Sequence, residues 1–308
     1  MPDAFIGIDV GGTNFRLGVV QDLRVVWEKR FQADFSGVCR RHSATEALEI
    51  ITSTLNDAVA EAKIAYPAIR AIGIGFPGFI DPVSHQVISS PNLPNLSNAD
   101  IVVPLERRSG LPVVLENDAS AAAYGEFALS AQSNGNLIYM GLGTGVGGGL
   151  VLHGKLHGGV HGVAMEVGHI TVERGGRLCG CGNRGCLEQY ASTNGVVQTY
   201  ADLTGKTLSA YDIAQAAQQQ DSAAVQAFEQ AGEYLACALA HIAKVVDVRD
   251  VVIGGGMSAS WPLMQAAFER RLSEDLIPAL RGKVKVRLSQ AQDQAGIIGA
   301  AMLSGHQG

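Results

Sequence analysis

Four residues with metal-binding side chains gather in one short segment of the chain, EVGHITVERGGRLCGCGNRGCLEQ, residues 166–189. They are His169, Cys179, Cys181 and Cys186. Thiolate and imidazole are ligands that zinc prefers, and four protein ligands complete its tetrahedral shell, which is typical of a structural site. The glycines between the cysteines permit the turns that this spacing requires. The sequence therefore predicts a structural Zn²⁺ site.

Chance clustering and a disulfide are the alternative interpretations of these cysteines. A thiol-rich cluster in a cytosolic protein is more often metal-binding or redox-active than disulfide-bonded, and this chain has the character of a cytosolic protein. Zinc is therefore favoured. The two other cysteines, Cys39 and Cys237, stand apart from the cluster and are expected to be buried or inert thiols.

Three glycine-rich segments could bind phosphate groups. They are DVGGTN at residues 9–14, LGTGVGGG at residues 142–149 and GGG at residues 254–256. Consecutive backbone amides without obstructing side chains form concavities that bind phosphate oxygens, and Asp9 could hold Mg²⁺ through water. Taken alone, the first segment could equally be a plain turn. Three such turns at the ends of strands, in two similar halves of the chain, indicate a phosphate-binding site more specifically than any one of them alone.

The second glycine segment contains a literal G-x-G-x-x-G, which suggests dinucleotide binding. That motif should open a helix, whereas the following LVLHGK reads as another strand. A dinucleotide-binding fold is therefore disfavoured, and no Walker A Lys-Ser/Thr pair follows either of the first two loops. The third segment precedes a helix that Ser258 or Ser260 could cap, and it suits a flat ligand close to the backbone.

Asp118 lies in PVVLENDASAAAYGE, directly after an apolar run and at the start of an alanine-rich segment. Asp is a frequent helix N-cap. From position alone, the N-cap is the simpler interpretation.

The elements that must position these residues follow a repeated pattern. The first half predicts strands at residues 4–10, 15–20, 24–30, 71–76 and 112–116, a helix at residues 44–64 with a capping box from Ser43 and Glu46, and a long connection at residues 77–100. The second half predicts strand, glycine turn and strand at residues 136–155, a helix at residues 225–246, strands at residues 250–254 and 285–288, and helices from about residue 262 and at residues 296–304. We infer an α/β protein of two related units, with the ligand site expected in a cleft between them.

Composition narrows the class of protein. A length of 308 residues suits two domains, and a hydrophobic content of 47% supports large cores. We find no apolar run that could span a membrane and no signal peptide in MPDAFIGIDV, so we expect a soluble, cytoplasmic protein. The 23 Lys and Arg residues against 29 Asp and Glu give a net charge of −6, which argues against nucleic acid as a partner.

The segments IDVGGTN, GLGTGVGGG, VIGGGMS and GH…CGCGNRGCLE resemble the ROK family of sugar kinases and repressors, within the actin/hexokinase-like ATPase fold. The resemblance covers essentially the whole chain. It implies two ribonuclease H-like α/β domains with an interdomain active-site cleft: a small N-terminal domain of residues 1–117 plus 296–308, and a large C-terminal domain of residues 118–295 that carries the zinc segment 169–186. A homodimer is also expected from the family.

The resemblance also implies roles for individual residues. Asp118 would be the catalytic base. The hexose would be bound by Gly78, Asn92, Asn117, Asp118, Glu166, His169 and Glu188. ATP and Mg²⁺ would be bound by Asp9, Gly11, Gly12, Thr13, Asn14, Gly143, Thr144, Gly145, Gly255 and Gly256.

His169 would serve two partners. If one ring nitrogen binds zinc, the other carries a proton and can donate to a sugar hydroxyl. Two positions depart from the family pattern: Met165 stands where Gly is usual before Glu166, and Asn14 stands where Lys is common, although Arg16 is near. The first departure leaves the identity of the sugar open, and the second removes a positive charge near the phosphates.

The function that we expect is ATP-dependent phosphorylation of a hexose at its 6-hydroxyl, with glucose favoured. Kinases for N-acetylglucosamine, N-acetylmannosamine, fructose, mannose and allose share these motifs, and polyphosphate is an alternative donor. A sugar-responsive transcriptional regulator of the same family would need a DNA-binding domain before the first strand, which begins by about residue 4, so we expect none. A catalytically silent structural ATPase would not need a site for sugar hydroxyls.

Overall fold

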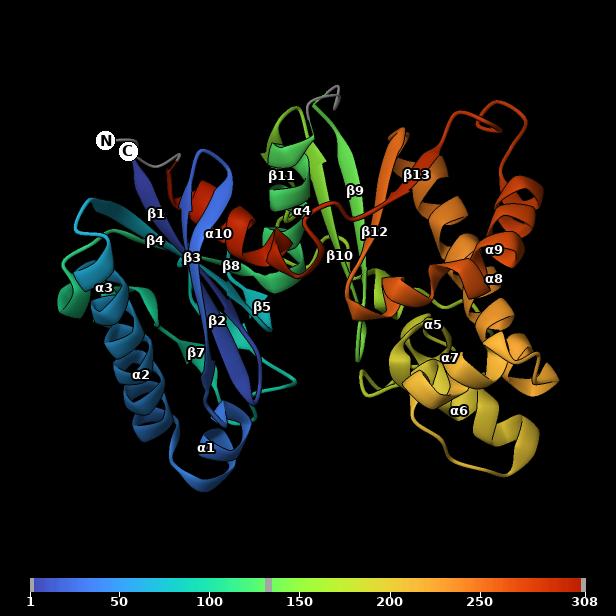
Figure 1. The fold of residues 1–308 in the computed structure, drawn as a ribbon, viewed down its shortest axis with the longest axis horizontal. Coiled ribbons are helices and arrows are strands. Elements are labelled where there is room, and N and C mark those ends of the chain that lie inside the picture. Colours follow the sequence, from blue (N-terminus) through green and yellow to red (C-terminus); the bar gives the residue numbers. More distant parts are fainter. Residues whose placement is uncertain (1–2, 131–134, 306–308) are drawn as a thin grey trace. The chain divides into compact units, whose positions relative to one another are not determined.

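The structure is a computed structural model that describes residues 3–130 and 135–305 (Figure 1). The chain divides into two compact units. The first comprises Met1–Gly135, Gly149–Ala164 and Asp293–Gly308, and the second comprises Asn136–Gly148 and Met165–Gln292. The domain boundary expected after residue 117 stays a prediction, but the first compact unit also includes the helix that follows it.

Runs of strands and runs of helices follow one another along the chain. The strands are β1 (Ala4–Val10), β2 (Asn14–Gln21), β3 (Arg24–Gln32), β4 (Ile69–Phe76), β5 (Phe79–Ile80), β6 (Val87–Ser89), β7 (Ser97–Ala99), β8 (Val113–Asn117), β9 (Leu137–Leu142), β10 (Val146–Leu152), β11 (Lys155–Leu156), β12 (Asp250–Gly254) and β13 (Lys285–Leu288). The α-helices are α1 (Phe35–Arg41), α2 (Ala44–Ala65), α3 (Val102–Ser109), α4 (Asp118–Leu129), α5 (Glu188–Ala191), α6 (Thr193–Thr204), α7 (Ala210–Gln218), α8 (Ser222–Val246), α9 (Trp261–Asp275) and α10 (Ala295–Gly305). Short 3₁₀ helices lie at Val167–His169, Gly256–Ser260 and Gln292–Gln294.

Two five-stranded sheets have the same strand order, which confirms the predicted repeat. One runs β3-β2-β1-β4-β8 and the other runs β11-β10-β9-β12-β13. In the first sheet, β1 pairs antiparallel with β2 and parallel with β4, and β4 pairs parallel with β8. In the second, β12 pairs parallel with both β9 and β13. Because parallel strands end at the same edge, the segments after β1, β4 and β8 emerge together.

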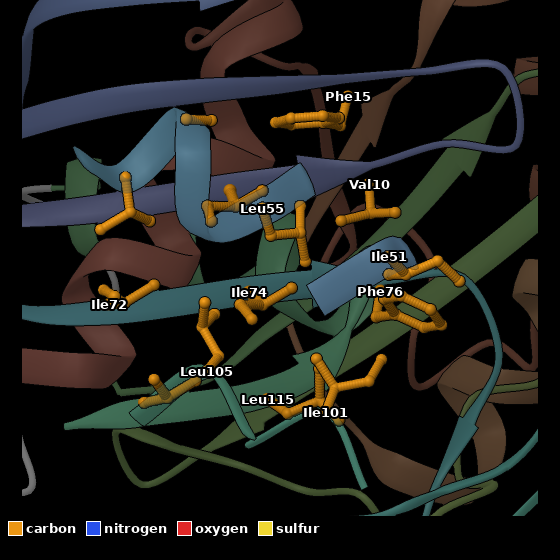
Figure 2. Packing of buried hydrophobic residues seen from close by; sticks show 14 of the residues in the cluster. Val10, Phe15, Ile51, Leu55, Ile72, Ile74, Phe76, Ile101, Leu105 and Leu115 are labelled. Atoms are coloured by element: carbon orange, nitrogen blue, oxygen red, sulfur yellow. The ribbon is translucent and has the colours of Figure 1, made fainter. Parts of the chain in front are cut away.

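The core of the first unit lies between its sheet and α2. Figure 2 shows side chains of this cluster from α2, α3 and the strands pointing toward one another. Ile51 and Leu55 of α2 are fully buried, as the helical period predicts. The predicted capping box is also confirmed: Ser43 accepts from the backbone amide of Glu46, and the Glu46 carboxylate accepts from the backbone amide of Ser43.

A row of glycines crosses the first sheet, and helix α10 packs on it. Gly7 lies opposite Gly18 on one side and Gly73 on the other. A Cβ atom at Gly7 would lie 1.9 Å from the carbonyl oxygen of Ile297, and one at Gly73 would lie 1.7 Å from that of Ala300. The backbone of α10 therefore rests directly on the sheet.

Helix α4 joins the same unit because it packs closely on α10. A Cβ atom at Gly125 of α4 would lie 2.1 Å from the carbonyl oxygen of Ala295, and one at Gly299 of α10 would lie 1.7 Å from that of Ala121. Two helix backbones approach this closely only where glycine removes the side chain between them. This contact explains why α4 groups with the first sheet.

Two predictions about local structure need correction or extension. Ser260 is the N-cap residue of α9, as one of the two predicted candidates, but its side chain makes no capping hydrogen bond. Ser258 lies within the 3₁₀ helix Gly256–Ser260 that precedes α9. The long connection at residues 77–100 contains its own three-stranded sheet, β5-β6-β7. In the described part of the chain, none of the helices is long and apolar enough to cross a membrane.

Candidate active site

The first glycine turn joins β1 to β2, and it is held in shape by backbone hydrogen bonds. Gly11 N donates to the carbonyl oxygen of Asn14 at 2.9 Å, and Thr13 is exposed at the turn. Asp9 at the end of β1 accepts from Arg16 of β2, with 2.7 Å between Oδ2 and the guanidinium. A carboxylate has two oxygens, so Asp9 can hold Arg16 and a water-bound Mg²⁺ together. The turn therefore fits the predicted phosphate and metal role.

Arg16 places a positive charge beside the first glycine turn. From the sequence, Arg16 was known only to lie close to this turn along the chain. Its side chain is 14% exposed, and it also donates to the backbone carbonyl of Asp293 and lies 3.9 Å from Glu28. The pairing could be found from sequence, because Asp9 and Arg16 are direct cross-strand partners in the β1–β2 hairpin.

The second and third glycine segments lie against each other in the second unit. Gly143 N donates to the carbonyl oxygen of Gly145 at 2.9 Å, and Thr144 is exposed at the turn, as Thr13 is in the first. Gly255 has φ +79°, and a Cβ atom there would lie 2.3 Å from the carbonyl oxygen of Leu142. At Gly256 the space within 4 Å is open. The backbone is thus accessible beside the turn.

Asn117 and Asp118 lie at the junction of β8 and α4, and the N-cap is Asn117. Its Oδ1 accepts from Ser120 N at 3.0 Å, and its Nδ2 donates to the carbonyl oxygen of Gly78 at 3.0 Å. Asp118 is the first residue of the helix, and its Oδ1 accepts from Ala119 N at 2.8 Å. The N-cap interpretation of Asp118 was therefore wrong, since its neighbour fills that position.

Gly78 and Asn92 lie in the connection between β4 and β8. Gly78 has φ +142°, and a Cβ atom there would lie 2.6 Å from the carbonyl oxygen of Ser89. Glycine is therefore required by the close approach of β6. Asn92 is exposed, and its backbone carbonyl accepts a hydrogen bond of 2.6 Å from the hydroxyl of Ser36. The bond from Asn117 to Gly78 ties this connection to the start of α4.

Glu166, His169 and Glu188 come together in the second unit. His169 Nε2 lies 3.8 Å from Glu166 Oε2. Burial raises the pKa of Glu166; the nearby His169 opposes this shift, and the charge of Glu188 adds to it. Glu188 Oε2 accepts from Val146 N at 3.2 Å, directly after the second glycine turn. Carboxylates and an imidazole in one group can both accept from and donate to sugar hydroxyls.

The four predicted zinc ligands also come together. Their ligand atoms all lie within 4.8 Å of one another. Cys179 Sγ lies 3.6 Å from His169 Nδ1, and Cys181 Sγ lies 3.6 Å from Cys186 Sγ. A tetrahedral site with Zn–S bonds of about 2.3 Å has edges of about 3.8 Å between sulfur atoms. The donor set therefore fits zinc.

The same distances exclude a disulfide in this cluster, since a bonded pair of sulfur atoms is about 2.05 Å apart. Cys39 is buried and Cys237 is half-buried; both are free. Burial raises the pKa of Cys186 to about 12, so this thiol would stay protonated at neutral pH without a bound cation. His169 presents Nδ1 to the thiols and Nε2 to Glu166, which leaves Nε2 as the nitrogen that could donate to a ligand.

Polar side-chain contacts connect the cysteine segment, residues 169–186, to neighbouring helices. Arg177 donates to Asp202 of α6 at 2.7 Å, and its guanidinium lies 4.7 Å from the ring centre of Tyr190. Tyr234 of α8 donates to Glu173 at 2.7 Å. These contacts tie both sides of the segment to helices. Sequence reasoning missed them, because the partners are 25 and 61 residues away along the chain.

Met165 has a left-handed backbone conformation, with φ +65°. It directly precedes Glu166, whose φ of −67° and ψ of 57° form an inverse γ-turn closed by Val167 N and the carbonyl oxygen of Met165 at 2.6 Å. A non-glycine residue in this region is strained. The position at which the sequence departs from glycine is therefore one where glycine would fit best.

Comparison with known proteins assigns the family. The model of the ROK family matches residues 5–307. The chain belongs to the ROK family. The glucokinase of Thermotoga maritima is 32% identical over 313 residues, which cover 97% of this chain and 96% of that protein. The N-acetyl-D-glucosamine kinase of Histophilus somni is 31% identical over 97% of this chain and 98% of that protein.

Two further proteins match over nearly the whole of this chain. A crystal structure of a ROK family glucokinase from Streptomyces griseus, in complex with glucose and AMPPNP, has a TM-score of 0.81 and 33% identity, with 99% of this chain and 100% of that chain covered. The xylose repressor of Bacillus subtilis is 28% identical over 97% of this chain and 76% of that protein. This ROK chain thus has the actin/hexokinase-like ATPase fold that the sequence predicted.

Proposed function

We propose that this ROK protein is a hexose kinase that transfers the γ-phosphoryl group of ATP to the 6-hydroxyl of glucose. The observation that carries the proposal is the position of Glu188 in the second unit. Its carboxylate accepts from the backbone after the second glycine turn and also contributes charge beside Glu166 and His169. A group suited to sugar hydroxyls therefore adjoins a turn suited to phosphate. The match to glucokinases favours glucose.

The proposed chemistry uses Asp118 as the general base. Its carboxylate accepts the proton of the 6-hydroxyl, the resulting oxygen attacks the γ-phosphorus, and the bond to the β-phosphate oxygen breaks to release ADP. Asn117 fixes the start of α4 and so orients Asp118. Gly78, Asn92, Asn117, Glu166, His169 and Glu188 are the proposed sugar contacts.

Each glycine turn has a proposed role in nucleotide binding. The backbone at residues 11–14 and 143–145 would bind phosphates, and Gly255 and Gly256 would lie along the adenosine. Asp9 would hold Mg²⁺ through water, and that ion would neutralise the charge on the phosphates. The cysteines and His169 Nδ1 would hold a structural Zn²⁺, which fixes the orientation in which His169 Nε2 donates to the sugar.

The activity is tested with purified protein in an ADP-release assay. The sugars are glucose, N-acetylglucosamine, N-acetylmannosamine, fructose, mannose and allose, and polyphosphate replaces ATP in a parallel series. We expect the highest kcat/KM with glucose and ATP. Transfer to none of these sugars would contradict the proposal, and a clear preference for N-acetylglucosamine would reassign the substrate.

The base is tested by Asp118→Asn, which keeps the size of the side chain but cannot accept the proton. We expect kcat to fall by a factor between about 10² and 10⁴. Glucose binding, measured by calorimetry, should change less than about threefold. The matched control is Asp57→Asn on the exposed side of α2, which should leave kcat unchanged. An Asp118→Asn variant with normal turnover would remove Asp118 as the base.

A further inference from the structure

Helix α1 connects two parts of the first unit to which separate roles have been given. At its start it contacts the first glycine turn, which is the proposed phosphate site. At both its start and its end it contacts the segment of residues 92–95, which includes the proposed sugar contact Asn92. Helix α1 was not predicted from the sequence, and the proposed function assigns it no role.

The contact with the glycine turn is made by backbone. Ser36 N donates to the carbonyl oxygen of Gly12 at 2.8 Å, and Ala33 N donates to that of Thr13 at 3.1 Å. A Cβ atom at Gly12 would lie 2.5 Å from Ser36 Oγ, so the turn and the serine are in direct contact. A movement of the turn would therefore displace Ser36.

The contact with the sugar-side segment is made by side chains. Ser36 Oγ donates to the backbone carbonyl of Asn92 at 2.6 Å. At the other end of α1, Asn95 Nδ2 donates to the carbonyl oxygen of Cys39 at 3.1 Å. The helix itself is anchored in the core, since Phe35 is buried and its ring stacks on Phe15 of β2 at 5.7 Å between centroids. Ser36 is thus the residue that touches both sites.

We propose that Ser36 is a positioning residue that couples nucleotide binding at the first glycine turn to hexose binding at Asn92. Its backbone amide donates to the first glycine turn and its hydroxyl donates to the backbone of Asn92. A position of Ser36 that suits the turn with nucleotide bound therefore also suits Asn92 with hexose bound. The inference rests on the proposed hexose kinase function. Ser36 contacts no reacting atom in this proposal, and its effect is on the affinity of each ligand in the presence of the other.

The test is the coupling of the two affinities, measured by calorimetry. The probes are glucose and AMPPNP, and N-acetylglucosamine replaces glucose if the sugar panel selects it. In the unmodified protein, we expect each ligand to strengthen binding of the other by about fivefold or more, and linkage requires the same factor in both directions. In Ser36→Ala, this factor should fall at least about threefold, again equally in both directions, while each ligand alone binds within about twofold of its original affinity.

Two further variants separate coupling from local structure. Asn95→Gly removes the second bond between α1 and the sugar-side segment, and glycine suits the φ of +69° at this position, so the coupling factor should also fall. Thr54→Ala removes a hydroxyl that bonds only within α2, to the carbonyl oxygen of Ile50, and it should leave coupling unchanged. Thermal unfolding of each variant reports any general loss of structure.

Unchanged coupling in Ser36→Ala would overturn the inference, as would equal weakening of both single-ligand affinities with coupling intact. Absence of coupling in the unmodified protein would overturn it too. The proposed function is tested separately, with the unmodified protein alone. It would fail if the unmodified protein transferred phosphate to none of the sugars in the panel.

Discussion

At the scale of single residues, Met165 combines a strained backbone with a position next to a proposed sugar ligand. Residues in sparsely populated conformations persist where the surrounding structure imposes them, and they concentrate at functional sites. Met165→Gly should relieve the strain, and the gain should exceed the extra chain entropy of glycine. We expect the free energy of unfolding in urea to rise by about 0.5–1 kcal/mol.

Val163→Gly is the control for this prediction, since Val163 is 44% exposed and is not among the residues with positive φ. It should lower the free energy of unfolding by about 0.5–1 kcal/mol. A Met165→Gly variant as destabilised as the control would show that the backbone at this position is not strained. The sugar panel, repeated on Met165→Gly, would report whether the methionine side chain restricts the sugars accepted.

The proposed site residues differ in how far the sequence predicted their local structure. Asn and Asp are both good N-caps and adjacent positions at a helix start are hard to tell apart, so the cap was assigned to Asp118 although Asn117 fills it. The pair of Asp9 and Arg16 follows from hairpin register. Ser36 gave no signal, because its role depends on Asn92, which lies 56 residues further along the chain.

At the scale of elements, the cysteine segment is a loop that brings the four proposed zinc ligands, His169, Cys179, Cys181 and Cys186, together. Removing the metal with a chelator, or one ligand with Cys179→Ser, should lower the thermal midpoint, since binding free energy contributes to folding where a site exists only in the native state. It should also raise KM for the hexose by about tenfold or more with little change in KM for ATP, because His169 and Glu166 lose their orientation.

Metal analysis should find one zinc per chain in the unmodified protein and less in Cys179→Ser. Cys237→Ser, which changes a half-buried thiol outside the cluster, should retain both the metal and the original KM. Lower stability with an unchanged KM for the hexose would limit the metal to a structural role. A protein that binds no zinc at all would contradict the site.

The elements that the sequence predicted well are those with a long and clear period. The strands of both sheets and helices α2 and α8 have regular apolar patterns, and the structure has them where expected. Helices α5, α6 and α7 of the second unit were missed, as were α1, α3 and the β5–β7 sheet of the first. Helix α1, α3 and the strands β5–β7 have too few residues for a period, and they are stabilised by packing on the rest of the first unit. The cysteine cluster was found because its ligands are close in sequence.

At the scale of the whole molecule, the glycine row of the first sheet determines how closely α10 packs. Gly73→Ala would place a Cβ atom against backbone, which cannot move aside as a flexible side chain could. We expect the free energy of unfolding to fall by at least about 2 kcal/mol. Gly158→Ala is the control in the same unit, because nothing lies within 4 Å of its Cβ position and its φ is not positive. Equal stability of the two variants would refute the close packing.

The packing of α10 on the glycine row affects how the first unit can fold while the protein is being synthesised. Strands β1, β2 and β4 emerge from the ribosome long before α10 (Ala295–Gly305), which covers their glycine face. At about 5–20 residues per second, more than ten seconds separate the two events. During that interval the first sheet lacks one of its layers, so its strands can complete their packing only after the more than 200 residues between β4 and α10 have also been made.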